Sequence, residues 1–222
     1  MPRRRRERTA GLVFHVINRA AKRAVLFHDN ADYAAFVTLL TDALGRSDVA
    51  LFAYCIMPNH WHFLLTPKSD GAMSRFMHWL TMTHARRWQD AHGVPGLGAV
   101  YQGRFKAIAV RDDDHFLRVC RYVERNPLRA SLVERAEDWR WSSLHTAGSS
   151  WLAPWPVARP CRWLAHVNAT QTSAELEHLR HAIKNGVPFG DADWAESLAR
   201  TQGASPRRSR GRPHRIKSVS VL

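Results

Sequence analysis

The most distinctive chemical feature of the sequence is His60-Trp61-His62, in which one bulky residue separates two histidines. Residues 60–66 predict a strand, and side chains two positions apart on a strand point to the same face. Two imidazoles on one face can share a divalent metal ion, while Trp61 points into the core and holds the strand. Taken alone the pair is a weak signal, because the chain has 13 histidines and chance pairs are expected.

Tyr122 and Asn126 form the second feature, four positions apart on a predicted helix and therefore on one face. An Asn amide oxygen can complete a site of two histidines, and a tyrosine beside that site could be a nucleophile. A free phenol is almost wholly protonated at neutral pH, so it attacks phosphorus only when the phosphate is polarised or a base is close. The alternative is structural: Tyr122 packs on the sheet and Asn126 caps the helix before Pro127. Taken alone, this pair favours the structural interpretation.

The elements that must position these residues follow a regular order. Strands are predicted over residues 12–18, 50–57, 60–66 and 104–110, and helices over 29–44, 69–92 and 112–125. This β-α-β-β-α-β order followed by one more helix is the ferredoxin-like order, so we predict an α+β fold with an antiparallel sheet and helices on one face.

Two local features within these elements have a structural explanation. His15, on the first strand, could approach the histidine pair, although a core or hydrogen-bonded histidine is the favoured interpretation. Asp112, Asp113 and Asp114 mark a helix start rather than a metal site, because consecutive helical residues point in directions about 100° apart.

Beyond residue 130 the patterns are weaker. A short helix is expected over 137–146, a connector over 149–160, a helix over 172–185 and a last helix over 191–201. Thr172 and Glu175 form a capping box for the helix over 172–185, and Gly186 ends this helix. We therefore expect a small helical C-terminal extension over 148–202 and a flexible basic tail over 203–222.

The positive charge is concentrated at the two ends of the chain. The net charge is +14; residues 1–28 hold eight Lys and Arg against one Glu, and residues 200–222 hold seven and no acid. Basic arms of this kind favour a nucleic-acid partner, because each cation can neutralise a phosphate, whereas the alternative is a solubilising tail. No apolar run suits a membrane span or a signal peptide, and three widely spaced cysteines indicate neither a disulfide framework nor a CxxC metal site. We expect a cytoplasmic protein, which is nucleoid-associated if its nucleic-acid partner is DNA.

Several segments together resemble one family. They are HVINRA (15–20), YCIMPNHWHFLLTP (54–67), YQGRFKAIAV (101–110), RYVERNPLRASLV (121–133) and WRWSS (139–143). The ensemble resembles the REP-associated tyrosine transposases, a branch of the HUH single-strand transposase superfamily. The resemblance runs from about residue 2 to residue 147. It implies a basic N-terminal arm over 1–10 and a tyrosine transposase domain over 11–147 with the ferredoxin-like fold and an added catalytic helix.

The resemblance also implies roles for individual residues. His60 and His62 match the metal-binding pair, Asn126 matches the third ligand, and Tyr122 matches the catalytic tyrosine. The implied cofactor is Mg²⁺ or Mn²⁺. Because histidine is softer than the oxygen ligands that Mg²⁺ prefers, Mn²⁺ is expected to support activity better in vitro.

The implied activity is cleavage and rejoining of single-stranded DNA at palindromic hairpin repeats through a 5′-phosphotyrosine. Two alternatives stay open: a mobile insertion-sequence transposase proper, and a non-catalytic hairpin-binding protein or repressor. The C-terminal extension could cover the surface a dimer would use, which favours a monomer over a homodimer. The candidate DNA-binding residues are Arg3, Arg4, Arg5, Arg6, Arg19, Arg104, Lys106, Arg121 and Arg125.

Overall fold

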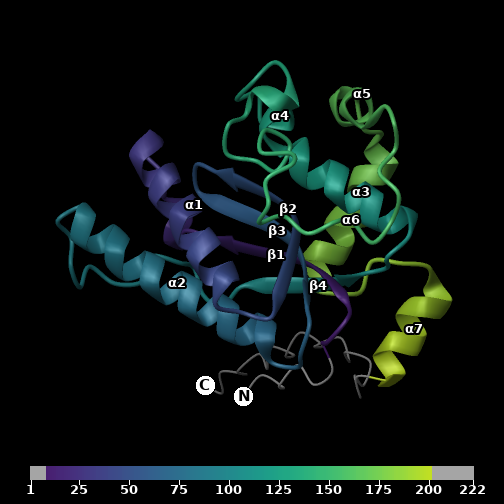
Figure 1. The fold of residues 1–222 in the computed structure, drawn as a ribbon, viewed down its shortest axis with the longest axis horizontal. Helices are drawn as coiled ribbons and strands as arrows, with labels where there is room; N and C mark the ends of the chain where they lie inside the picture. The colour runs from purple at the N-terminus through teal and green to yellow at the C-terminus, as the bar shows by residue number, and fades with distance from the viewer. Residues whose placement is uncertain (1–8, 202–222) are drawn as a thin grey trace, which may run out of the picture.

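The computed structural model describes residues 9–201, which form a four-stranded sheet flanked by helices (Figure 1). The strands are β1 (Val13–Arg19), β2 (Val49–Met57), β3 (His60–Pro67) and β4 (Lys106–Val110). The helices are α1 (Asn30–Gly45), α2 (Ala72–Ala91), α3 (Asp114–Glu124), α4 (Asn126–Arg129), α5 (Trp163–Asn168), α6 (Ser173–Asn185) and α7 (Ala192–Thr201), with short 3-10 turns at Ala21–Arg23 and Ala136–Asp138.

The sheet has the strand order β2-β3-β1-β4, and every neighbouring pair is antiparallel. β3 is an inner strand, in which His62 pairs with Ile17 of β1 on one side and with Cys55 of β2 on the other. Together with the element order, this topology confirms the predicted ferredoxin-like α+β fold. An inner strand is held along both edges, so its side chains have well-defined positions.

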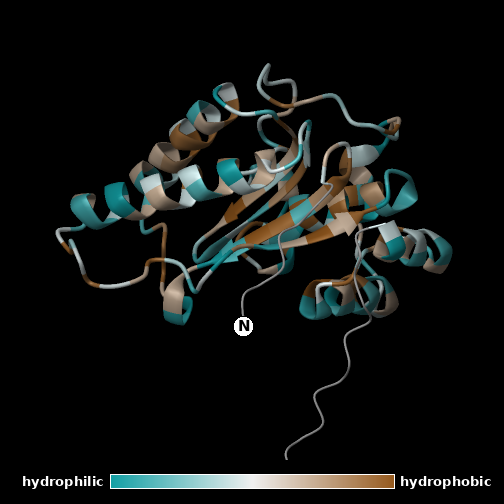
Figure 2. Ribbon diagram, turned by 90° about the horizontal axis from the view of Figure 1, so that it is seen from below, coloured by the Kyte–Doolittle hydropathy of each residue, from teal (hydrophilic) through white to brown (hydrophobic). Residues whose placement is uncertain are grey.

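Helices cover both faces of the sheet, with α1 and α2 on one face and α3 and α6 on the other (Figure 1). Trp61 and Phe63 of β3 belong to the core beneath α1 and α2, whereas Leu64 belongs to the core beneath α3. The prediction that helices would lie on one face is therefore wrong. The reason is that apolar residues of the strands contribute to a core on each face, so each face must be covered. Figure 2 shows much of the sheet in the brown of hydrophobic residues.

Local signals in the sequence explain most of the helix boundaries. Asp29 caps α1 by accepting hydrogen bonds from the amides of Ala31 and Asp32. Asp113 caps α3 by accepting from the amide of His115, which confirms the helix-start role of the aspartate run.

The C-terminal half matches the predictions only in part. The capping box of Thr172 and Glu175 is present at the start of α6, and Gly186 ends this helix in the left-handed conformation. The predicted helix over 137–146 is wrong apart from the 3-10 turn at its start. Trp139 and Trp141 both pack against the core beneath α1 and α2, so tertiary contacts rather than helical periodicity decide this segment.

The segment after residue 147 packs on both sides of the sheet: α5 and α6 contribute to the core beneath α3, whereas Trp151 and Leu198 pack with the core beneath α1 and α2. Phe189 is buried beside β4, with its amide donating to the Ala109 carbonyl at 2.8 Å, and the indole N–H of Trp163 donates to Glu124 at 2.7 Å. The boundary predicted at 147–148 stays a prediction. The run Arg3–Arg6 and the tail 203–222 lie outside the described residues. Within 9–201, no helix combines the length and apolar character needed to cross a membrane.

Candidate active site

His60 and His62 lie on β3 and face the α3 side of the sheet. Their ring centroids are 5.0 Å apart. Trp61, between them, is fully buried in the core beneath α1 and α2, where its ring stacks on Phe63 at 4.4 Å. The strand alternation expected from the sequence therefore places two imidazoles side by side on one face, with a large anchor on the other face.

Both imidazoles are in the neutral form that binds metals at physiological pH. Burial, with Arg19 and Arg129 nearby, lowers the pKa of His60 to about 4, and burial together with the neighbouring histidines and arginines lowers the pKa of His62 well below its usual value. Nδ1 of His60 lies 2.6 Å from the side-chain oxygen of Asn59, an acceptor, so Nδ1 carries the proton. The Nε2 lone pair of His60 is therefore available to a ligand.

A third histidine supports this pair from β1. His15 is fully buried, its Nε2 lies 2.9 Å from Nδ1 of His62, and the two rings stack with centroids 5.1 Å apart. Burial lowers the pKa of His15 to about 3, so it too is neutral. The favoured interpretation of His15 as a hydrogen-bonded core histidine is confirmed, and the structure adds that its partner is His62.

Tyr122 and Asn126 approach the histidines from α3 and α4. The Tyr122 ring lies edge-on to His62 at 5.9 Å and to His15 at 6.0 Å between centroids. Asn126 begins α4 after a break at Arg125, yet the hydrogen bond from the Arg125 amide to the Arg121 carbonyl continues the helical path. The two side chains therefore remain on the same side of the chain, as their spacing predicts, and both are buried.

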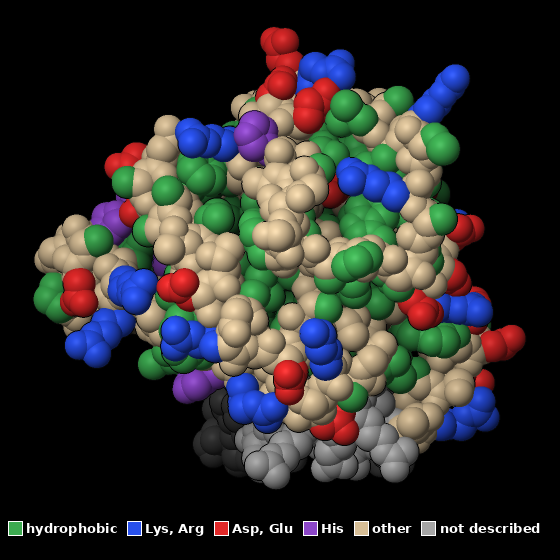
Figure 3. All heavy atoms as spheres, in the orientation of Figure 1, with side chains coloured by type: hydrophobic (Ala, Val, Ile, Leu, Met, Phe, Trp, Pro, Cys, Tyr) green, Lys and Arg blue, Asp and Glu red, His purple; other side chains and the backbone are tan. Residues whose placement is uncertain are grey.

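His60, His62, Tyr122 and Asn126 line one cavity with a volume of about 590 Å³. Five Lys and Arg side chains of the described chain line it as well, whereas no Asp or Glu of residues 9–201 does. On the surface seen in Figure 3, by contrast, Lys and Arg are interspersed with Asp and Glu. A cavity with cations and no carboxylate is suited to a polyanion. The five cations are Arg19, Arg104, Lys106, Arg129 and Arg180.

Three of the five cations were predicted from the sequence as DNA-binding residues. Arg19 ends β1 and Lys106 begins β4. Arg104 was expected on the fourth strand, but it lies in the bend that precedes β4. It nevertheless lines the same cavity, because the segment 102–104 runs along its wall.

Arg121 and Arg125, also predicted to bind DNA, contact the end of α5. Arg125 donates to the carbonyls of Val167 and Asn168 at 2.8 and 2.6 Å, and Arg121 donates to those of Ala169 and Thr170 at 2.8 and 3.3 Å. Guanidinium groups thus satisfy the free carbonyls at a helix C-terminus. Neither residue lines the cavity that holds Tyr122, and their contact with DNA stays a prediction.

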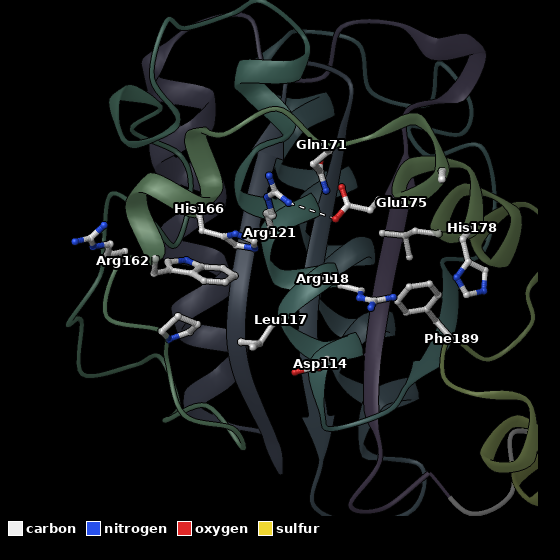
Figure 4. Close-up of a pocket in the computed structure, with 14 residues that line it drawn as sticks. Asp114, Leu117, Arg118, Arg121, Arg162, His166, Gln171, Glu175, His178 and Phe189 are labelled. Atoms are coloured by element: carbon white, nitrogen blue, oxygen red, sulfur yellow. Dashed lines mark ion pairs between the residues drawn. The ribbon is translucent and has the colours of Figure 1, made fainter.

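Arg121 also borders a second hollow, of about 660 Å³, between α3, α5 and α6. Figure 4 shows its ion pair with Glu175, at 3.6 Å, at one end of this hollow. Leu117, Trp163 and Phe189 form apolar parts of the wall. The hollow has acids as well as cations, and none of the histidines of β3 reaches it.

The side chains at the cavity fit a divalent metal ion in type and protonation. His60 and His62 are neutral, and Asn126 has an amide oxygen that accepts from Arg129 at 2.8 Å, while its buried Nδ2 has no hydrogen-bond partner within the described chain. Nowhere in residues 9–201 do three or more His, Cys, Asp and Glu side chains gather as a metal site. An ion held here would depend on Asn126 and on a bound ligand for its remaining contacts.

The cavity also has lining residues that were not among the predicted site residues. Arg129 lies one helical turn after Asn126, and this spacing was the available signal. Arg180 and Ile183 come from α6, far along the chain, and no local pattern connects them to the histidines.

Comparisons with known proteins concern the family and the fold of the chain. Residues 9–126 match the family model described as "Transposase IS200 like". A Haemophilus influenzae protein described as a REP-associated tyrosine transposase is 27% identical over 101 residues, which cover 42% of this chain and 57% of that protein. The match thus spans little more than half the length of that relative.

Two solved structures are also similar. A REP-associated tyrosine transposase bound to a REP hairpin superimposes with a TM-score of 0.56 and 20% identity, over 78% of this chain and 96% of that one. A Deinococcus radiodurans structure described as a transposase has a TM-score of 0.40 and 20% identity, over 60% of this chain and 92% of that one.

Proposed function

The chain belongs to the IS200-like transposase family, and from that premise we propose that it cleaves and rejoins single-stranded DNA at palindromic hairpin repeats. The observation that carries the proposal is the cavity in which Tyr122 lies beside His60 and His62 among five cations and, within the described chain, no carboxylate. Such a cavity attracts a phosphodiester and places a hydroxyl nucleophile beside it.

Tyr122 is the proposed nucleophile, and its surroundings distinguish it from the other three tyrosines of the chain. Burial raises the pKa of Tyr33 and Tyr101 above the usual range and that of Tyr54 to about 12, and none of these three lines the cavity. Tyr101 and Tyr54 are moreover engaged with His84 and Thr146. Tyr122 alone among the four combines a place in the cavity with proximity to the histidines of β3.

The proposed reaction is an in-line exchange at phosphorus. A bond forms between the Tyr122 oxygen and phosphorus while the bond between phosphorus and the 3′ oxygen breaks. The phenol gives up its proton and the 3′ oxygen takes one up, so the products are a 5′-phosphotyrosine and a free 3′-OH. The reverse reaction with the same or another 3′-OH rejoins DNA, and no external energy source is needed.

His60, His62 and Asn126 would hold a Mg²⁺ or Mn²⁺ ion. When bound, such an ion withdraws charge from the oxygens of the scissile phosphate. Arg19, Arg104 and Lys106 would bind the phosphates that flank it, because all three line the same cavity. Trp61 contributes indirectly, since its burial fixes the strand on which both histidines lie.

A cleavage assay tests the proposal. Single-stranded oligonucleotides that carry host-genome palindromes with their flanks are incubated with protein and Mn²⁺ or Mg²⁺, and a denaturing gel resolves covalent adducts. We expect a 5′ adduct with wild type, none with Tyr122→Phe, and a strongly reduced yield with His62→Ala. Tyr33→Phe, which removes a buried hydroxyl outside the cavity, is the matched control and keeps wild-type activity.

The same assay separates this function from a hairpin-binding repressor. Tight hairpin binding without an adduct in either metal, on substrates with correct flanks, would contradict the catalytic proposal and favour the non-catalytic alternative.

A further inference from the structure

Arg129 lies over the ring of the proposed nucleophile. Its guanidinium carbon lies 4.1 Å from the centroid of the Tyr122 ring, and its Nη2 donates to the Asn126 side-chain oxygen at 2.8 Å. The residue is the last of α4 and lines the cavity together with His60 and His62. A single side chain thus contacts both the tyrosine and the amide predicted to act in the reaction.

Arg129 differs from the structural arginines nearby. Arg121 and Arg125 direct their donors to backbone carbonyls at the end of α5. Nε of Arg121 and Nη1 of Arg129 are both buried without a hydrogen-bond partner within residues 9–201, but of the two arginines only Arg129 lines the cavity that holds Tyr122. Since no Asp or Glu of the described chain lines the cavity, the charge of Arg129 also lacks a carboxylate there. A half-buried arginine whose guanidinium has a buried donor without a partner is suited to binding an anion.

The electrostatics agree with this interpretation. Burial lowers the pKa of Arg129 from its ordinary value, and the neighbouring Arg180 and Arg125 act in the same direction. The guanidinium nevertheless stays charged, because its ordinary pKa lies far above neutrality. An arriving phosphate would replace the water that the guanidinium has lost and relieve the repulsion between these cations.

We propose that Arg129 is a catalytic residue that binds the scissile phosphate through Nη1 and stabilises the negative charge that builds on its non-bridging oxygens during attack by Tyr122. This inference rests on the proposed function. Arg129 keeps its ring contact with Tyr122 in this role, so the phosphate is held directly beside the attacking hydroxyl. Nη2 would donate to the Asn126 oxygen as long as no metal ion is bound to that oxygen.

The experiment compares wild type, Arg129→Ala and Arg129→Lys on two substrates under single-turnover conditions. One substrate has a normal scissile phosphodiester, and the other has a methylphosphonate that lacks one non-bridging oxygen and its charge. We expect Arg129→Ala to slow adduct formation about 100- to 1,000-fold on the phosphodiester, the usual effect of removing one oxyanion donor. Arg129→Lys should restore part of the rate. On the methylphosphonate the difference between wild type and Arg129→Ala should shrink to less than about tenfold, because the partner of Nη1 is already missing.

Controls separate this role from a structural one. Arg87→Ala removes an exposed arginine from α2, on the opposite face of the sheet, and should match wild type on both substrates. Equal losses for Arg129→Ala on both substrates would show that the variant only disturbs Asn126 or Tyr122, and would overturn the proposal. Wild-type rates for Arg129→Ala on the phosphodiester would overturn it as well.

A binding measurement keeps this inference distinct from the proposed function. In the Tyr122→Phe background, which cannot form the adduct, Arg129→Ala should weaken binding of the phosphodiester oligonucleotide at least tenfold more than binding of the methylphosphonate oligonucleotide. If wild type forms the adduct and this difference is absent, Arg129 has no contact with the scissile phosphate while the proposed function stands. If wild type forms no adduct, the proposed function fails and the binding difference alone decides whether Arg129 binds that phosphate.

Discussion

Replacing His15 with phenylalanine should weaken metal binding at His60 and His62 although His15 is not itself a proposed ligand. Nδ1 of His62 is engaged with Nε2 of His15 at 2.9 Å, so only Nε2 of His62 can face an ion. A neutral imidazole carries one proton, and a metal-binding Nε2 requires that proton on Nδ1. His15 must therefore accept it, which fixes the tautomer of His62.

The magnitude follows from the burial of this hydrogen bond. His15 is fully buried and His62 is 4% exposed, so water cannot replace a missing acceptor. In His15→Phe the Nδ1–H of His62 either stays unpaired or moves to Nε2, where it blocks the ion. Leaving a buried donor unpaired costs about 1–3 kcal/mol, which corresponds to a loss of about 5- to 150-fold in affinity. The free energy of unfolding should not fall, because the substitution also removes Nδ1 of His15, a buried nitrogen without a hydrogen-bond partner within the described chain.

The assay is a Mn²⁺ titration followed by electron paramagnetic resonance of the free ion. It uses Tyr122→Phe protein with hairpin DNA bound, so that no turnover occurs. His15→Gln, which keeps an acceptor oxygen near the position of Nε2, is the matched control and should bind within a few-fold of the parent. If His15→Phe binds Mn²⁺ as tightly as the parent while both remain folded, the tautomer argument is wrong. If the parent binds no Mn²⁺, the proposed metal site itself is wrong.

The remaining predictions concern stability and metal removal. Burial lowers the pKa of His84 from 6.5 to about 3, so below pH 6.5 the unfolded chain binds a proton at this histidine that the folded chain does not bind. His84 should therefore lower the free energy of unfolding by about 1.4 kcal/mol between pH 7.5 and 5.5. In urea unfolding, His84→Gln should lack this part of the decrease in stability. Trp61→Ala should lower the free energy of unfolding by about 3–5 kcal/mol, because the indole is fully buried, and a loss below about 1 kcal/mol in urea unfolding would contradict its role as the anchor of β3. Arg121→Ala should speed hydrogen exchange in α5, because Arg121 binds the carbonyls that follow this helix. Arg118→Ala removes an exposed arginine of α3 instead, and hydrogen exchange in α5 of this variant should match wild type. Chelation by EDTA should abolish adduct formation but leave hairpin binding by Tyr122→Phe intact, because five cations rather than a metal line the cavity; loss of binding would show that the ion carries the affinity.

Local patterns in the sequence predicted a large part of this architecture. Alternation along 60–66 placed His60 and His62 on one face and Trp61 on the other, since the period of a strand is two in any sheet. The capping box of Thr172 and Glu175 marked the start of α6 correctly, because a capping side chain binds amides only two or three residues away. The segment 137–146 was predicted wrongly, because there Trp139 and Trp141 pack against distant residues and override local preference.

The sequence alone thus determined the order of the elements and the face of β3 on which the histidines lie, and it predicted which side chains would carry the chemistry. Only the tertiary structure decided how these parts meet. It directed Arg121 and Arg125 to the end of α5, added Arg180 from α6 to the cavity, and paired His15 with His62. The physical reason is range: alternation, caps and turns depend on residues within one helical turn, whereas these contacts join residues more than 40 positions apart and form only when the strands and helices pack.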